Sequence, residues 1–496
     1  MSGALLIAGC LIAPCIAVLA GPLLRAHPNR REAASLACAA LLIAFVLPLS
    51  LVVMDGQRPT LTLLEFLPGV SLRFEAEPLG VAFALIVSLL WPVTILYAIG
   101  YMRAHGEANQ TRFYLFFALA IVTTIGGALA GNLLTLYLFY EALTLATYPL
   151  VTHGGGRKDR AAGRIYLAIL LGTSFVFLLL AIAWVYLTTG TLEFVNGGLL
   201  LENGQLRGQL TPGLVAVLYA LFLFGTAKAA LMPFHGWLPA AMVAPTPVSA
   251  LLHAVAVVKL GVFAILKVTV YTFGIDTLLE LEATTFMQGV AAFSLLAAAV
   301  LALREDSLKR RLAYSTISQL AYVVLAATLA NTSSLLAGGI HIAAHAFAKI
   351  TLFFCAGVIL ISLHKTAVSE LGGSGRALPI TWTAWIIASL CVIGLPFTGG
   401  FWSKWYLVQG TLDAERPFLL AVVLLGSLLA MGYLLPPAIR AFFGPGPADA
   451  RAASAGQTVK APWTSLAALS FTAVLTVLLF FVAQPMVGLL QGISVR

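Results

Sequence analysis

The chain has 496 residues, of which 60% are hydrophobic and 9% are charged, and its mean hydropathy is +0.99. Soluble domains usually carry about a quarter charged residues, so this composition excludes an ordinary soluble globule. The five cysteines all lie in apolar segments and form no C-x-x-C pair. Because no pattern for an iron–sulfur cluster, haem, flavin or nucleotide is present either, we expect no cofactor and no redox chemistry in this chain.

Apolar runs of about twenty residues recur along the whole chain and predict an all-α polytopic membrane protein. About fourteen transmembrane helices are expected, at residues 3–24, 33–54, 78–101, 112–131, 132–152, 164–190, 212–236, 246–271, 284–303, 312–330, 334–363, 380–407, 417–443 and 463–490. They divide into an N-terminal three-helix segment (1–111), two five-helix units (112–271 and 284–443) and a C-terminal helix (463–496).

Basic residues concentrate in alternate loops between these spans. Eighteen of the 28 fall on one side: Arg25, Arg30, Arg31, Arg103, Arg112, Arg157, Lys158, Arg160, Arg164, Arg304, Lys309, Arg310, Arg311, Lys365, Arg376, Arg440, Arg451 and Lys460. Because loops rich in lysine and arginine stay on the cytoplasmic side, both termini are predicted on the outer (periplasmic) face of the cell inner membrane. The net charge of +9 then reflects orientation and calls for no nucleic-acid partner.

Six charged residues fall inside the expected spans: Glu141, Lys228, Lys259, Lys267, Lys349 and Lys404. A charge in the middle of the bilayer costs about 3 kcal/mol, so these groups must face the protein interior, pair or contact water. Glu141 lies about 14 Å along its helix, near the middle of the bilayer, where a glutamate is too short to reach the interface. It is either a member of a proton or cation relay or a carboxylate that ties two helices together.

Two of the buried lysines lie beside helix-breaking residues. Lys228 stands between Gly225 and Pro233, and Lys404 follows Pro396 and two glycines. Helix breaks at membrane depth often mark ion sites. The two spans are the seventh and the twelfth, and a five-helix unit repeated in tandem must be inverted across the membrane. We therefore expect inverted repeats in which Lys228 and Lys404 occupy equivalent positions.

The eighth span carries two more lysines and a histidine. Lys259 lies about eleven residues into its helix, again near the middle of the bilayer. His253 is either a histidine packed in the protein interior or a member of the relay. Lys267 lies two turns further on, and we expect its side chain to extend to the outer interface.

His341, His345 and Lys349 are four residues apart and form one stripe on the eleventh span. Two histidines at this spacing can bind zinc, but no carboxylate or cysteine is supplied nearby and a lysine occupies the next turn, so no metal is expected. Imidazole and desolvated lysine both exchange protons near neutral pH. The stripe therefore favours a hydrated proton relay.

Four sequence motifs resemble those of a known protein family. They are PFHGWLPAAMVAPTPVSALLHAVAVVKLGVF (233–263), LKRRLAYSTISQLAY (308–322), HIAAHAFAKITLFFCAG (341–357) and GFWSKW (400–405). Over residues 78 to 440 the chain resembles the antiporter-like membrane subunits of respiratory complex I, of Mrp-type cation/proton antiporters and of related hydrogenases. One departure is Ala240, where the resembling proteins commonly have aspartate.

The resemblance implies fourteen helices, inverted repeats, broken seventh and twelfth helices, and a midplane chain of charged groups. It implies that Glu141 and Lys228 form a charge pair, that Lys259, His341, His345 and Lys349 connect the two halves, and that Lys404 matches the lysine of helix twelve. The expected function is proton translocation within a complex of several membrane subunits. The alternatives are a Mrp-type Na⁺/H⁺ antiporter subunit, a subunit energising a hydrogenase or an inorganic-carbon uptake partner, and a structural scaffold.

Overall fold

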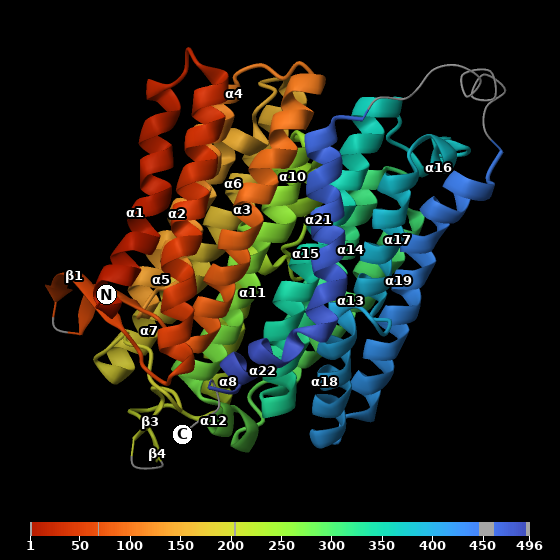
Figure 1. Ribbon diagram of the computed structural model, residues 1–496. Coiled ribbons are helices and arrows are strands. Elements are labelled where there is room, and N and C mark those ends of the chain that lie inside the picture. The colour runs from red at the N-terminus through yellow and green to blue at the C-terminus, as the bar shows by residue number, and fades with distance from the viewer. Residues whose placement is uncertain (1, 68, 203–204, 446–460, 493–496) are drawn as a thin grey trace.

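The computed structural model describes residues 2–67, 69–202, 205–445 and 461–492 as a bundle of long helices (Figure 1). Within these residues, twelve helices are long and apolar enough to cross a membrane, and two further apolar helices are shorter. The expected polytopic membrane fold is confirmed, whereas the count of fourteen spans stays a prediction. Arg451 and Lys460, which contribute to the charge asymmetry, lie outside the described residues.

Most of the expected spans are single helices. These are α1 (Gly3–Leu23), α2 (Pro28–Met54), α3 (Pro78–Ala104), α4 (Gln110–Ala128), α5 (Leu133–Val151), α13 (Thr285–Arg304), α14 (Leu308–Leu329), α15 (Thr332–Leu363), α19 (Pro417–Phe443) and α21 (Trp463–Phe481). Two more contain π-helical turns. One joins α6 (Arg157–Thr173), η1 (Ser174–Leu178) and α7 (Leu179–Thr189), and the other joins α10 (Thr246–Ala250), η4 (Leu251–Val255), α11 (Val257–Val268) and η5 (Thr269–Phe273).

The two interruptions predicted beside buried lysines are present. Helix α8 (Pro212–Gly225) ends just before the short 3₁₀ turn η2 (Ala227–Ala229), and α9 (Trp237–Ala240) with η3 (Ala241–Val243) follows after a non-helical stretch. Likewise, α17 (Pro379–Ile393) is separated from α18 (Gly399–Asp413) by a segment that begins at Gly394. Gly394 has φ +91°, and an added Cβ would lie 2.5 Å from Cδ of Lys404. A side chain there would force the lysine out of its position.

Short elements fill the connections. Strands β1 (Thr60–Leu67) and β2 (Val70–Glu75) pair antiparallel, as do β3 (Leu201–Glu202) and β4 (Gln205–Leu206). The others are α12 (Ile275–Glu280), η6 (Val368–Glu370), α16 (Ser374–Ala377) and α22 (Ala483–Gln491). The all-α expectation did not include these hairpins, whose short alternating segments lie outside the long apolar runs. The start of α1 and the hairpins lie towards the same end of the bundle (Figure 1).

The centre of the bundle holds the two spans that carry Lys259 and the stripe of His341, His345 and Lys349. The span that runs from α10 to η5 is buried along its whole length, and α15 is buried without a break from Ser334 to Ile359. Helix α15 packs against α3, α10, α14, α17, α18 and α21. A helix that is apolar all round and also buried all round belongs to the interior of a larger assembly of helices. These two spans are therefore shielded by the helices around them.

Candidate functional site

The predicted relay residues lie in the protein interior rather than against lipid. The lysines Lys228, Lys259 and Lys349 have no exposed surface, and His341, His345 and Lys404 are at most 7% exposed. Glu141 is half-buried, but both of its carboxylate oxygens are inaccessible. Burial of this kind removes hydration, so each group must find its stabilisation in neighbouring polar atoms.

Lys228 is held by helix α5, the helix that carries Glu141. Its Nζ donates to the Tyr140 carbonyl oxygen at 2.8 Å and to Thr144 Oγ1 at 2.6 Å. The ammonium also lies 3.2 Å from the centroid of the Tyr140 ring. The interruption of the helix after α8 brings this side chain towards α5, because Lys228 is the central residue of the 3₁₀ turn η2.

Glu141 and Lys228 do not form a direct ion pair. Neither carboxylate oxygen of Glu141 has a hydrogen-bond partner among the described residues, and Lys228 Nζ donates instead to the Tyr140 carbonyl oxygen and to Thr144 Oγ1. The carboxylate is nevertheless within electrostatic range of Lys228 and near the Ser174 hydroxyl of η1. The arrangement is therefore a separated charge pair.

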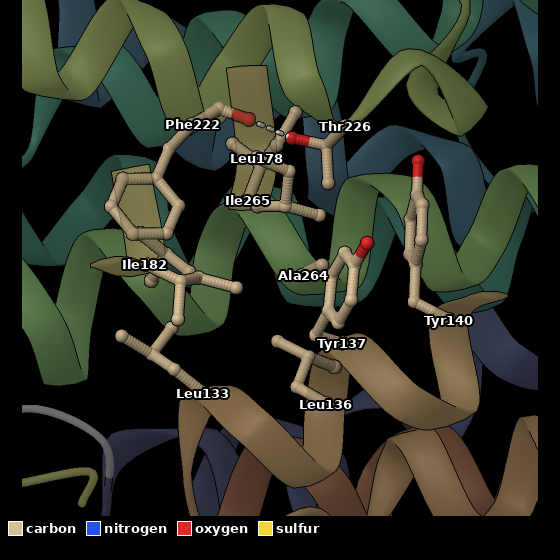
Figure 2. A pocket seen from close by; sticks show the side chains of 11 residues that line it. Leu133, Leu136, Tyr137, Tyr140, Leu178, Ile182, Phe222, Thr226, Ala264 and Ile265 are labelled. Carbon is tan, nitrogen blue, oxygen red and sulfur yellow. Dashed lines mark hydrogen bonds between the residues drawn. The ribbon is translucent and has the colours of Figure 1, made fainter. Parts of the chain in front are cut away.

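A small cavity adjoins this pair, between α5, η1, α7, α8 and α11 (Figure 2). Its lining consists of Leu133, Leu136, Tyr137, Tyr140, Leu178, Ile182, Phe222, Thr226, Ala264, Ile265 and Val268. The space amounts to about 10 Å³, the lower limit for one water molecule. Figure 2 shows the Tyr137 and Tyr140 rings side by side on α5, while the Thr226 hydroxyl is bonded to the Phe222 carbonyl. The cavity is thus almost entirely apolar.

A polar contact between two side chains links the two central spans. Lys259 Nζ on α11 is within hydrogen-bonding contact of His345 Nδ1 on α15. The His345 and His341 rings stack at a centroid distance of 5.9 Å. A charged lysine donates to Nδ1, whereas a neutral one accepts from it, so this contact can pass a proton in either direction.

His341 extends this line to the second interrupted span. Its Nδ1 lies 3.0 Å from Oγ of Ser403, the residue before Lys404. Lys404 Nζ donates to the Ile393 carbonyl at 2.9 Å and to Ser427 Oγ at 2.8 Å. The Ile393 carbonyl is among those that the end of α17 leaves without a helical partner.

Tyr322 on α14 joins the same cluster through the face of its ring. The ring stacks on His341 at 5.7 Å, and Lys404 Nζ lies 4.6 Å from its centroid. The hydroxyl donates to the Val423 carbonyl at 3.0 Å and lies 3.4 Å from Ser427 Oγ, which also accepts from Lys404. Tyr322 therefore offers the lysine a direct cation–π contact through its ring and shares Ser427 with it through its hydroxyl.

The side chain of Lys349 bonds to partners other than those of His341 and His345, although its spacing places it on the same stripe. Its Nζ donates to Ser315 Oγ at 2.6 Å and reaches the Leu312 carbonyl of α14 at 3.3 Å. Ser315 in turn donates to the Tyr433 hydroxyl at 3.1 Å. His341 and His345 thus form one branch between α11 and α18, and Lys349 forms a second branch towards α14 and α19.

The expectation that Lys267 extends to the outer interface is wrong. The side chain is 1% exposed, and its Nζ lies 3.1 Å from Oε1 of Glu77. Glu77 also accepts from the backbone N–H groups of Leu79 and Gly80, both at 2.7 Å, and from the Tyr271 hydroxyl at 2.9 Å. A buried partner at the N-terminus of α3 holds the lysine inside the bundle.

We expect Glu77→Gln to lower stability by about 3–5 kcal/mol, because it leaves the Lys267 ammonium buried without its counter-charge. Thermal unfolding of the purified protein in detergent measures this loss. The double variant Glu77→Gln, Lys267→Met removes both charges and should recover part of it. Unchanged unfolding in the single variant would contradict the assigned ion pair.

His253 makes no hydrogen-bonding contact with the predicted relay residues. It is fully buried in η4, and among the described residues neither ring nitrogen has a hydrogen-bond partner. Its ring packs on Phe353 at a centroid distance of 4.6 Å. His341 and His345 gain no further metal-ligating neighbour either: the described residues hold no cluster of three or more His, Cys, Asp or Glu side chains placed to bind a metal ion.

Several polar partners in this site did not stand out in the sequence. They are Tyr140, Thr144, Ser315, Tyr322, Ser403 and Ser427. For Tyr140, Thr144, Ser315 and Ser403 the available signal was position: each carries a hydroxyl inside an apolar span, next to a charged residue or within about one turn of it, whereas Tyr322 and Ser427 have no such neighbour in the sequence. Tyr140 and Thr144 flank Glu141, and Ser403 precedes Lys404.

Comparison with known proteins adds an independent finding. Residues 130–430 match the family model described as NADH:quinone oxidoreductase/Mrp antiporter, transmembrane region. NADH-quinone oxidoreductase subunit N of Desulforudis audaxviator is 32% identical over 371 residues, which cover 74% of this chain and 72% of that protein. NAD(P)H-quinone oxidoreductase chain 5 of Synechocystis is 33% identical over 345 residues, 68% of this chain, and the match spans 49% of that longer protein.

The solved structures agree on the fold. A chain of the Mrp complex from Dietzia superposes with a TM-score of 0.81, covering 99% of this chain and 97% of that chain at 22% sequence identity. At this identity the likeness concerns the fold alone. It extends over nearly the whole molecule, including both interrupted spans.

Proposed function

Since the chain belongs to the NADH:quinone oxidoreductase/Mrp antiporter family, we propose that it is a proton-translocating subunit of a membrane complex with several subunits. Protons pass along a buried chain of groups from Glu141 and Lys228, through Lys259 and the two stacked histidines, to Lys404. The contact of Lys259 with His345 carries this proposal, because it joins the two central spans midway between the interrupted ones.

The separated charge pair provides the starting point. An ammonium near the Glu141 carboxylate is stabilised by it, and moving the two apart weakens that stabilisation and releases a proton. Lys228 is bound to Tyr140 and Thr144 in the separated arrangement. A driving event elsewhere in the complex would shift the lysine between its α5 partners and the carboxylate.

The energy required to move a proton against the membrane potential is modest. Moving one elementary charge against 100 mV costs about 2.3 kcal/mol. Coupling between distant sites in proteins is typically about 1–3 kcal/mol, so a change at one end of the chain is sufficient for a step of this size. Water must enter between Lys228 and Lys259, between the two stacked histidines, and between Ser403 and Lys404 for the transfer to be complete.

We also propose an arrangement of repeats and a membrane orientation for this chain. The units at 112–271 and 284–443 act as inverted repeats, flanked by the segment 1–111 and the C-terminal helix at 463–496. The protein lies in the cell inner membrane with both termini on the periplasmic side. The charge bias of the loops supports this orientation, and the two similar interruptions at Lys228 and Lys404 support the repeats.

The transported ion separates the main proposal from the Na⁺/H⁺ alternative. The described line consists of imidazole nitrogens, lysine ammonium groups and serine hydroxyls, which pass protons, and it contains one carboxylate at one end. Na⁺ prefers several oxygen ligands. We therefore propose H⁺ as the ion moved along this chain, with energising of an attached hydrogenase or carbon-uptake partner as a variant of the same role.

Proton uptake into liposomes that contain the purified complex tests the function. We expect an imposed membrane potential to drive acidification at the same rate in sodium-free choline buffer and in sodium buffer. A rate that depends on Na⁺ would favour the antiporter alternative, and no uptake in either buffer would favour the scaffold.

A further inference from the structure

A second cavity, of about 310 Å³, lies where α14 begins and α15 ends. Three cationic side chains line it, those of Lys309, Arg310 and Lys365. The hydroxyl-bearing residues Ser307 and Thr366 lie beside them. None of these groups takes part in the proposed proton chain. Together they offer ammonium, guanidinium and hydroxyl donors around one space, as an oxyanion requires.

The lining of the cavity includes three cationic side chains and no carboxylate, so it carries an excess of positive charge. Glu305 Oε2 lies 3.3 Å from an Arg310 guanidinium nitrogen and neutralises one of the three cations, and Lys309 Nζ donates to the Ala244 carbonyl oxygen. Asp306 accepts hydrogen bonds from the Ser369 backbone at 2.9 Å and from its hydroxyl at 2.7 Å. These bonds hold the pKa of Asp306 below its usual value, and the guanidinium groups of Arg311 and Arg440 lie near enough to lower it as well and to offset its negative charge.

The apolar wall of the cavity consists mainly of Met242 and Val243 from η3 and of Leu360 from the last turn of α15. Val243 is 44% exposed and therefore accessible from outside the bundle. The cavity thus combines a cationic wall with an apolar wall, at the level where two spanning helices meet the membrane surface.

We propose that this cavity binds the phosphate of an anionic glycerophospholipid. The phosphate sits against Arg310 and Lys365, and the glycerol and first acyl carbons contact the apolar wall. Basic pockets between transmembrane helices are known to hold such headgroups. Free inorganic phosphate shares the charged part of this chemistry but gains nothing from Met242 and Val243. The proposal does not depend on proton transfer.

The test measures lipid retained by the purified complex in nanodiscs of phosphatidylcholine with a minor share of phosphatidylglycerol. Wild-type protein should bind phosphatidylglycerol in preference to phosphatidylcholine, as read by native mass spectrometry. Each of Arg310→Gln and Lys365→Gln should reduce this preference about fivefold. Arg376→Gln, an exposed arginine on α16 away from the cavity, is the matched control.

Equal preference in wild type, Arg310→Gln and Lys365→Gln would overturn the proposal, as would an equal loss in Arg376→Gln. Competition with inorganic phosphate separates the two sources of phosphate. If millimolar inorganic phosphate displaces the lipid as effectively as free phosphatidylglycerol does, the site is a phosphate site and the lipid assignment is wrong. Selective loss in the cavity variants with no such displacement supports the lipid.

Discussion

Replacing Lys228 with alanine is expected to lower proton translocation about 100-fold or more, the usual effect of removing a group that transfers a proton. Alanine leaves the Tyr140 carbonyl and the Thr144 hydroxyl without the ammonium and carries no proton itself. Glu141→Gln, which keeps the size of the side chain but removes its charge, should have a similar effect. The measurement is acidification of liposomes that contain the purified complex and a pH-sensitive dye.

Lys158→Ala provides the matched control for this prediction. It makes the same chemical change at an exposed lysine on α6, outside the buried chain. Assembly of the complex should be retained in all three variants, because water can fill the small space left beside a hydroxyl and a carbonyl. Normal translocation in Lys228→Ala would rule out the first half of the chain.

At the other end, Lys404→Met is expected to have an equally large effect. Methionine has nearly the length of lysine and fills the same space, but it donates nothing to the Ile393 carbonyl or to Ser427. The proton chain then ends at His341, and translocation should fall about 100-fold. The same liposome assay measures it.

Tyr322→Phe distinguishes loss of the proton carrier from general disturbance at this end. The Tyr322 hydroxyl donates to the Val423 carbonyl and reaches Lys404 only through their shared partner Ser427, whereas the ring face contacts Lys404 and His341 directly. Phenylalanine keeps that face, so the translocation rate should be essentially unchanged. A loss in Tyr322→Phe as large as in Lys404→Met would mean that packing, not proton carriage, explains both variants.

The sequence predicts the location of the buried charges better than their partners. Apolar runs of membrane length, with lysines set beside glycine and proline, were sufficient to place Lys228 and Lys404 at helix breaks. These are local signals, because a break depends on residues within a few positions of it. The spacing of four residues likewise placed the two histidines on one face, where they stack.

Partners contributed by distant segments could not be predicted in the same way. Lys267 was expected at the interface because Glu77, its partner, precedes the third span and is separated from it by 190 positions in sequence. Lys349 follows the spacing of the stripe, yet its hydrogen bonds go to α14. Periodicity fixes the face of a helix on which a side chain lies, whereas tertiary packing decides which neighbour it meets.

The proposal that protons cross between the two halves is tested most directly at His345. The variant His345→Phe keeps an aromatic ring against His341 but removes the nitrogen that Lys259 contacts. In liposomes that contain the intact complex, acidification under an imposed potential should fall to the level of protein-free vesicles. Acidification at the wild-type rate would contradict lateral transfer between Lys259 and Lys404.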